Sequence, residues 1–275
     1  MKRHGTTVIL LVVLIAGLSL LLYPSFSDWW NSMHQSRAVA SYVEQVAQID
    51  EEQYAHLWDA AWNYNRSLID RPNTYALNDA QKAEYDQILD IGGLGIMGYI
   101  EVPAIGVTLP IYHGTDEAVL QIAVGHLEWT SLPVGGESSH CVVSGHRGLP
   151  SAKLFTDLDK LVVGDIFVFR VLDEILTYEV DQILIVKPNE TEALLIQEGQ
   201  DLCTLITCTP YGVNSHRLLV RGHRVENQEE VKAIRVTADA MQIEPVIVAP
   251  IVAIPMLLVL LIFLLIPKPR RRRFD

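Results

Sequence analysis

The chain contains few cysteines and few basic residues. Only three of its 275 residues are cysteine, and lysine and arginine number 21 against 33 aspartates and glutamates. The net charge is −12, whereas proteins that bind nucleic acid need a basic surface to contact its phosphates, so we expect no nucleic-acid partner. Neither a CxxC pair nor an HxxxH spacing occurs, so we expect no metal and no cofactor. Internal repeats and low-complexity segments are also missing.

Charge is absent from two long apolar stretches, residues 5–27 and 246–266. Each can cross a hydrocarbon core of roughly 30 Å at about 1.5 Å per helical residue. Basic residues flank the terminal side of each stretch, while Asp28 and Glu244 flank the inner sides. The positive-inside rule therefore predicts a multi-pass membrane protein with both termini cytoplasmic and the intervening residues extracytoplasmic. The alternatives are a cleaved signal peptide for the first stretch and a buried core helix for the second.

The residues between the two stretches divide into a helical part and a β-rich part. Apolar residues recur at a helical period over residues 28–70, with a break near 48–52, and residues 69–93 indicate a loop followed by a short helix. We therefore expect a helical stalk at 28–95, a catalytic domain at 96–226 and a linker at 227–245. Within 96–226 the strands are expected at 98–102, 109–112, 140–144, 166–172, 176–186, 202–207 and 218–225, and short helices at 116–124, 152–161 and 190–195.

Closely spaced strands with few helices between them indicate a mainly β fold, either a closed barrel or a sandwich. A thiol, an imidazole and a guanidinium stand at the ends of three strands, on Cys208, His146 and Arg217. A cysteine thiolate can attack a carbonyl, a histidine can exchange protons near neutral pH, and an arginine can stabilise an oxyanion. Residue type alone leaves rivals open, namely His113, His126, His140, His216, His223, Arg221 and Arg224.

Seven segments around these residues follow one another over about half of the chain. They are Gly98-Tyr-Ile-Glu-Val-Pro103, Leu109-Pro-Ile-Tyr-His-Gly-Thr115, Gly125-His-Leu-Glu128, Ser131-Leu-Pro-Val-Gly-Gly136, Gly145-His-Arg-Gly-Leu-Pro-Ser-Ala-Lys-Leu-Phe-Thr-Asp-Leu-Asp159, Thr207-Cys-Thr-Pro-Tyr-Gly212 and Asn214-Ser-His-Arg-Leu-Leu-Val-Arg-Gly222. In this order they resemble the class C, or pilus-assembling, sortases of Gram-positive bacteria.

The resemblance implies a sortase-like closed β-barrel and a function. Cys208 would attack the Thr–Gly bond of an LPxTG-like sorting signal and form a thioacyl enzyme. His146 would act as acid and base, and Arg217, in an N-x-H-R-L pattern, would hold substrate and stabilise the oxyanion. The partners would be pilin or surface-protein precursors and the acceptor lysine amine of a pilin. The alternatives are a sortase that anchors monomeric surface proteins to peptidoglycan and a catalytically idle pilin-binding scaffold.

Pilus sortases carry a lid motif in which an aromatic residue directly follows Asp-Pro. Here Asp70, Pro72 and Tyr75 are present but scattered, so we expect the segment Ile69–Asp79 to cover the site weakly or not at all. The alternative is that this segment still forms a lid that covers the site.

The other two cysteines precede the candidate site residues at equal distances. Cys141 lies five residues before His146, and Cys203 lies five residues before Cys208. An odd offset along a regular strand turns both away from the catalytic face. If the two strands are neighbours, as the resemblance implies, we expect small buried thiols, with a disulfide as the alternative.

Overall fold

The computed structural model describes residues 2–69 and 76–227. The chain separates into two compact units, one of Met1–Trp29 with Arg235–Asp275 and one of Trp30–Ile234. Helix α1 (Lys2–Val46) begins in the first unit and continues in the second. Three expectations fall outside the described residues. They concern the second membrane span, most of the linker, and the scattered lid residues Asp70, Pro72 and Tyr75.

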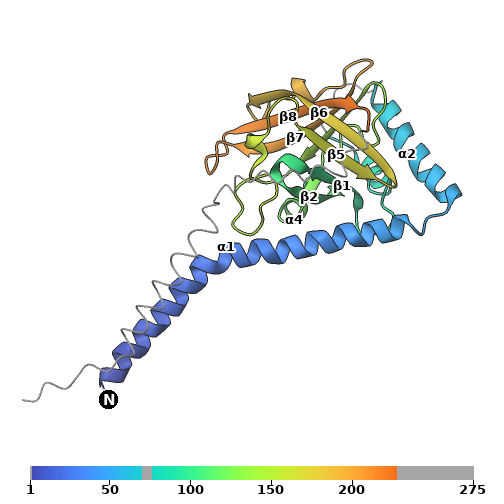
Figure 1. Ribbon diagram of the computed structural model, residues 1–275. Coiled ribbons are helices and arrows are strands. Elements are labelled where there is room, and N and C mark those ends of the chain that lie inside the picture. The colour runs from blue at the N-terminus through green and yellow to red at the C-terminus, as the bar shows by residue number, and fades with distance from the viewer. Residues whose placement is uncertain (1, 70–75, 228–275) are drawn as a thin grey trace, which may run out of the picture. The chain divides into compact units, whose positions relative to one another are not determined.

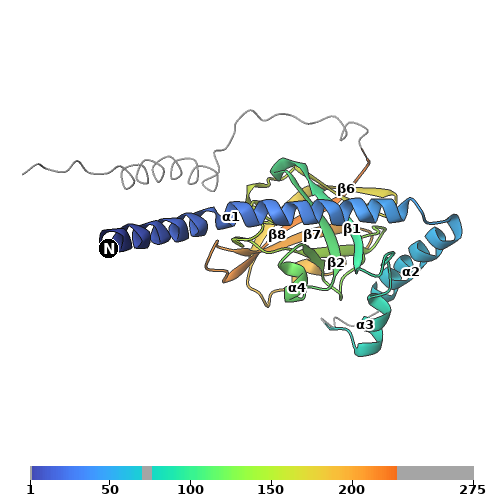
Figure 2. The ribbon, with the colours of Figure 1, turned by 90° about the horizontal axis from the view of Figure 1, so that it is seen from below.

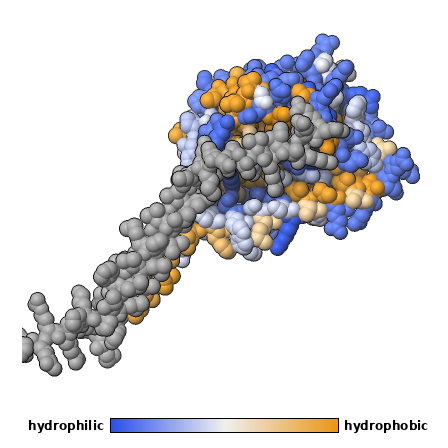
Figure 3. Space-filling model, viewed as in Figure 1, coloured by the Kyte–Doolittle hydropathy of each residue, from blue (hydrophilic) through white to orange (hydrophobic). Residues whose placement is uncertain are grey.

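The first part of α1 has the character of a membrane span. Among the described residues, one helix is long and apolar enough to cross a membrane, judged by length and composition, and it is α1 from Val8 onward. Large apolar side chains are exposed along it, as the orange surface of this helix shows (Figure 3). Exposure of so many apolar side chains disfavours water as their surroundings, which fits membrane anchoring at this end of the chain.

Eight strands form a closed barrel in the second unit (Figure 1). They run in the order β1-β2-β3-β4-β7-β8-β6-β5, in which β2–β3 and β4–β7 are parallel pairs and the others antiparallel. The strands are β1 (Ile96–Val102), β2 (Val107–His113), β3 (Val124–His126), β4 (Ser139–Ser144), β5 (Ile166–Val171), β6 (Glu174–Val186), β7 (Asp201–Thr209) and β8 (His216–Val225). The expected mainly β barrel is confirmed.

The barrel interior is filled by alternate residues of the strands. Val143, Leu205, Val220 and Phe169 are all at most 1% exposed and belong to one core cluster. Because successive side chains of a strand point to opposite faces, the residues between them face outward. The inward positions are β-branched or large and apolar, which is why these runs form a barrel rather than helices.

Three helices are fastened to the barrel by buried polar side chains. The Tyr42 hydroxyl, on α1, donates to Met97 O at 3.1 Å and accepts from Leu172 N at 2.7 Å. Asn65, on α2 (Glu51–Ile69), exchanges two hydrogen bonds with the backbone of Leu132. Tyr85 ends α3 (Asp79–Tyr85) and is fully buried. Figure 2 shows α1 passing β1, so the expected stalk packs on the barrel.

The expected short helices are each present only in part, and one strand was not expected. Residues 152–161 form turns with a short 3-10 helix, η2 (Leu158–Lys160), because Phe155 and Leu158 both turn into the core. The sequence also gave no sign of β3, whose three residues pair with both β2 and β4. The helices expected at 116–124 and 190–195 are short, as α4 (Glu117–Leu120) and the 3-10 helix η3 (Glu192–Leu194).

Candidate active site

Strands β7 and β8 bring the candidate nucleophile and the candidate oxyanion ligand together. Cys208 and Arg217 are direct partners in the antiparallel ladder between these strands. Directly opposite residues of such a ladder project to the same face of the sheet, with Cβ atoms about 4.5–5.5 Å apart. The sulfur and the guanidinium therefore lie on one face, and both side chains are half-buried.

The register of β4 and β7 places His146 beside Cys208. Parallel pairing runs from Ser139 opposite Asp201 to Ser144 opposite Ile206. Two hydrogen bonds extend it past the strand, because Gly145 N donates to Ile206 O at 3.0 Å and Thr207 Oγ1 donates to Gly145 O at 2.8 Å. Continuing the same register by two residues aligns His146 with Cys208. All three candidate residues therefore lie at the ends of three adjacent strands, β4, β7 and β8.

The glycine before His146 is required by packing. A Cβ atom at Gly145 would lie 2.7 Å from Cδ2 of Phe155 and 3.0 Å from Cγ1 of Val124, both of which are fully buried. The backbone of His146 is also tied down, since Phe155 N donates to His146 O at 3.1 Å. The loop that carries the imidazole is thus held against the core.

The rival histidines have structural contacts. Burial lowers the pKa of His140 to about 4, so its ring is neutral, with Nδ1 donating to Leu195 O at 2.9 Å. Burial also lowers the pKa of His113, whose two ring nitrogens lie at backbone carbonyls. His126 is fully buried and contacts Ser131 O. His216 is the ladder partner of Thr209, so it faces away from Cys208. His223 is the ladder partner of Leu202, so it shares the face of Cys208 but lies six residues away along β7.

The rival arginines are held by carboxylates. Arg221 makes two hydrogen bonds to Asp181, at 3.0 and 2.8 Å. Arg224 lies 3.8 Å from a carboxylate oxygen of Asp201. Arg217 instead donates to two carbonyl oxygens, those of Asn214 at 3.3 Å and His216 at 3.2 Å, and no carboxylate of the described residues pairs with it. Its guanidinium can turn to a substrate without breaking an ion pair with those residues.

An apolar strip on the outer face of the barrel leads to these three residues. Its buried members come from β4, β7, β8 and η3, and they are Val142, Ile206, Leu219 and Leu194. Ile206 lies two residues before Cys208 on the same face of β7, and Val186 of β6 is the ladder partner of Arg217. The contact between His140 and Leu195 O holds the β6–β7 connection over this strip. The strip can accept apolar side chains of an extended peptide.

The remaining two cysteines face the barrel interior. Cys141 and Cys203 are direct ladder partners and are 2% and 0% exposed, and both are free thiols. Burial raises the pKa of Cys203 well above its ordinary value. The expectation of small buried thiols turned away from the catalytic face is confirmed, and the alternative disulfide is not formed.

Sequence reasoning missed one residue at the site, Arg147. It follows His146 directly and contacts Thr209, which follows Cys208 directly. The sequence could have indicated Arg147 only through its position directly after the candidate histidine. Thr207, interpreted from the sequence as a strand residue, lies in β7 and is 1% exposed, and its hydroxyl donates to Gly145 O in the neighbouring loop.

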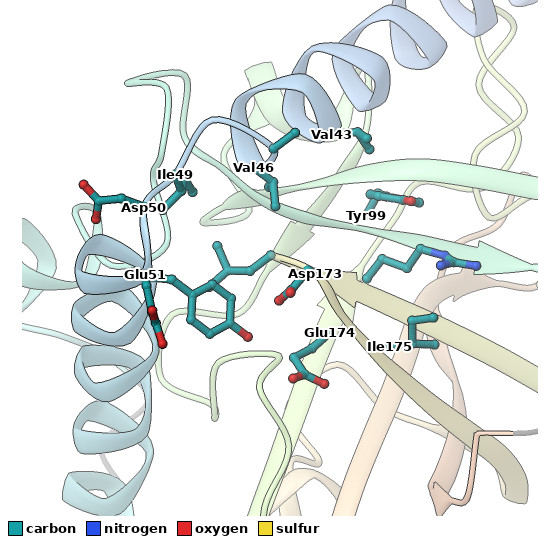
Figure 4. Close-up of a pocket in the computed structure, with 13 residues that line it drawn as sticks. Val43, Val46, Ile49, Asp50, Glu51, Tyr99, Asp173, Glu174 and Ile175 are labelled. Atoms are coloured by element: carbon teal, nitrogen blue, oxygen red, sulfur yellow. The ribbon is translucent and has the colours of Figure 1, made fainter.

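A cavity of about 720 Å³ lies elsewhere on the barrel unit. It is bounded by the end of α1, the start of α2 and the β5–β6 hairpin, and four carboxylates line it, those of Asp50, Glu51, Asp173 and Glu174 (Figure 4). Glu174 begins β6, whereas Val186, opposite Arg217, ends it. Because its lining contains neither thiol nor imidazole, this cavity is separate from the candidate active site.

Comparison with known proteins gives one consistent family. Residues 100–225 match the model of the Sortase domain. The crystal structure of sortase C1 from Streptococcus agalactiae is 49% identical, covering 70% of this chain and 100% of that one, with a TM-score of 0.68. The crystal structure of sortase C from Streptococcus pneumoniae, described as giving insights into pilin substrate specificity, is 46% identical, covering 70% of this chain and 97% of that one, with a TM-score of 0.64.

A curated relative agrees at lower coverage. Sortase D of Bacillus subtilis is 31% identical over 46% of this chain, and the chain spans 63% of the length of that protein. The structure of sortase C-1 from Actinomyces oris is 48% identical, covering 63% of this chain and 99% of that one, with a TM-score of 0.60.

Proposed function

Because the chain belongs to the sortase family, we propose that it is a membrane-anchored cysteine transpeptidase that polymerises pilin subunits. The observation that carries the proposal is the pairing of Cys208 with Arg217 across β7 and β8, with His146 aligned beside them. The proposed substrates are pilin precursors with an LPxTG-like sorting signal, and the proposed acceptor is a lysine amine of the next pilin.

The first half of the reaction forms a thioester. The Cys208 thiolate attacks the carbonyl carbon of the threonine in the Thr–Gly bond, and negative charge develops on the carbonyl oxygen. Arg217 stabilises that oxyanion, because its guanidinium lies on the face of the sulfur. The C–N bond then breaks, and protonated His146 supplies a proton to the departing glycine amine.

The second half transfers the acyl group. Neutral His146 takes a proton from the incoming lysine amine, which attacks the thioester carbonyl. The C–S bond breaks, an amide bond joins the two pilins, and the Cys208 thiolate is regenerated. Throughout, apolar residues of the sorting signal lie on the strip of Val142, Ile206 and Leu219.

The proposed topology follows from the charge pattern of the sequence. Residues 1–27 form one membrane helix with a cytoplasmic tip, and residues 246–275 form a second with a basic cytoplasmic tail. The stalk of residues 28–95, the catalytic domain of residues 96–226 and the linker of residues 227–245 are extracytoplasmic. The exposed apolar surface of α1 supports the first span.

The proposed function is tested with the full chain purified in detergent micelles. A peptide containing an LPxTG-like signal is incubated with either a lysine-bearing pilin peptide or a peptidoglycan stem peptide, and the products are identified by mass spectrometry. Cleavage with transfer to the pilin lysine supports the proposal. Transfer to the peptidoglycan amine alone would indicate a sortase that anchors monomeric proteins, and pilin binding without cleavage would indicate an idle scaffold.

A further inference from the structure

The guanidinium of Arg147 connects three segments around the proposed catalytic residues. Its Nη1 donates a hydrogen bond to Oγ1 of Thr209 at 3.4 Å. Its Nη2 pairs with the carboxylate of Asp159 in η2. Its Cζ lies 5.9 Å from the ring centroid of Tyr211. One side chain therefore bridges the loop that follows β4, the 3-10 helix η2 and the segment that follows β7.

This bridge lies directly behind the catalytic pair. Arg147 and Thr209 are 62 residues apart, the same separation as the ladder partners Ser144 and Ile206. They are also the immediate neighbours of His146 and Cys208. Because Thr209 follows Cys208 on β7 and adjacent residues of a strand point to opposite faces, the Arg147–Thr209 bond is on the face opposite to the thiol.

The burial of Arg147 does not suit a merely stabilising ion pair. Its side chain is only 10% exposed, and its Nε is buried without a hydrogen-bond partner among the described residues. A buried charge that is incompletely hydrogen-bonded tends to destabilise a fold, although it can specify a geometry. The loop is also closely packed there, since a Cβ at Gly148 would lie 2.7 Å from the Tyr211 ring.

We propose that Arg147 is a positioning residue that sets the distance between the His146 imidazole and the Cys208 thiol. This inference rests on the proposed function. Proton transfer in both half-reactions requires the imidazole within hydrogen-bond reach of the reacting groups. Arg147 fixes the loop of His146 to the strand of Cys208 through Thr209, and Asp159 and Tyr211 hold the guanidinium in place.

The first test compares variants of the full chain in detergent micelles. Arg147→Met removes the bridge and keeps the length of the side chain, and Thr209→Val removes only the accepting hydroxyl. Arg170→Met is the matched control. Arg170 lies on β5 and forms another ion pair of the barrel, with Glu101 at 3.0 Å, and the substitution breaks that pair. Arg147→Lys keeps the charge but loses the planar fork that reaches two partners.

We expect Arg147→Met to lower kcat about tenfold to a hundredfold, with KM changed by less than about twofold. Its Tm should fall no more than that of Arg170→Met, and Thr209→Val and Arg147→Lys should give intermediate kcat values. The proposal would be overturned if Arg147→Met lowered kcat no more than Arg170→Met does. It would also be overturned if Arg147→Met and Thr209→Val both lowered Tm more than Arg170→Met does, because their kcat loss would then reflect lost stability.

The second test asks whether Arg147 acts through His146. The rate of Cys208 alkylation by iodoacetamide at pH 7 is measured by peptide mapping, because thiolate is the reacting form. The charged and titratable groups around the thiol are His146, Arg217, His216 and the Arg147–Asp159 pair.

Arg147→Met should slow the alkylation of Cys208 severalfold in the native chain. In a chain that already carries His146→Ala, adding Arg147→Met should not slow alkylation further. Equal slowing in both backgrounds would overturn the proposal. No substrate enters this measurement, so a chain that fails to cleave sorting signals but shows the coupling would contradict the proposed function and not the role of Arg147.

Discussion

Cys208 and Arg217 face each other across the antiparallel ladder of β7 and β8. The turn between the two strands has only six residues, Pro210 to Ser215, so the proposed nucleophile and the proposed oxyanion ligand come from one hairpin. His146 arrives from a different part of the barrel, through the parallel pairing of β4 with β7. The site therefore depends on the strand register of β4, β7 and β8, because a one-residue slip would turn the side chains of the slipped strand to the other face.

Replacement of Arg217 by lysine should remove most of the activity. An ammonium lacks the planar fork that can hold two acceptors at once, and loss of one oxyanion donor costs about 10²–10³ in kcat. Arg221→Lys should be mild in comparison, because Arg221 is already occupied by Asp181. Steady-state kinetics of peptide cleavage compares the two variants. Equal losses, or the reverse order, would show that Arg217 has been assigned the wrong role.

The three cysteines should all titrate as thiols once the chain is unfolded. In the native protein a bulky thiol reagent should react with Cys208 alone, because Cys141 and Cys203 are 2% and 0% exposed. Quantitative titration with a chromogenic disulfide should therefore rise from about one equivalent to about three on unfolding. A count that stays at one in denaturant would show that the two buried cysteines form a disulfide.

Mild acid should destabilise the barrel through His140. Its pKa is lowered by burial from 6.5 to about 4, so between these values the unfolded chain binds a proton that the folded chain does not. Stability from this group is complete above pH 6.5 and is lost as the pH falls to about 4, by at most about 3 kcal/mol. Asp181 and Arg221 are the charged groups near the ring.

The pH effect is measured as Tm at pH 7 and pH 4.5 for the native chain and for His140→Asn, which can still donate to Leu195. The Tm of His140→Asn should fall less between pH 7 and pH 4.5 than that of the native chain. The control His56→Asn, on the exposed surface of α2, should show the same fall in Tm as the native chain. An identical loss in all three proteins would exclude His140 as the source.

The C-terminus should be cytoplasmic. A fluorescent protein fused after Asp275 should mature and fluoresce, because it stays in the cytoplasm when residues 246–266 span the bilayer toward the basic tail. Alkaline phosphatase fused at the same position should be inactive for the same reason. Active phosphatase with a dark fluorescent protein would place this end outside the cytoplasm.

The mainly β fold was predictable from the sequence because its strands are short β-rich runs separated by turns, whereas the choice of a closed barrel over a sandwich rested on the family resemblance. Strand β3 was not predictable, since three residues are too few to show the alternating pattern of a strand. Residues 152–161, expected as one short helix, are helical only at η2, because Phe155 enters the core from the turn that precedes it.

The candidate site was proposed from the family resemblance and not from residue spacing. Cys208, His146 and Arg217 carry suitable chemistry, but their adjacency follows from the ladders of three strands, which residue spacing does not reveal. The bridge from Arg147 to Thr209 was invisible for the same reason, because its partners are 62 residues apart.

The most direct test of the account is the covalent intermediate on Cys208. The full chain is mixed with an LPxTG peptide and examined by mass spectrometry, and the account predicts an acyl adduct that maps to Cys208 and is absent from a folded Cys208→Ala variant. Oxygen is a far weaker nucleophile than a thiolate at neutral pH, so Cys208→Ser should also lack the adduct. An adduct that persists in Cys208→Ala would contradict the account.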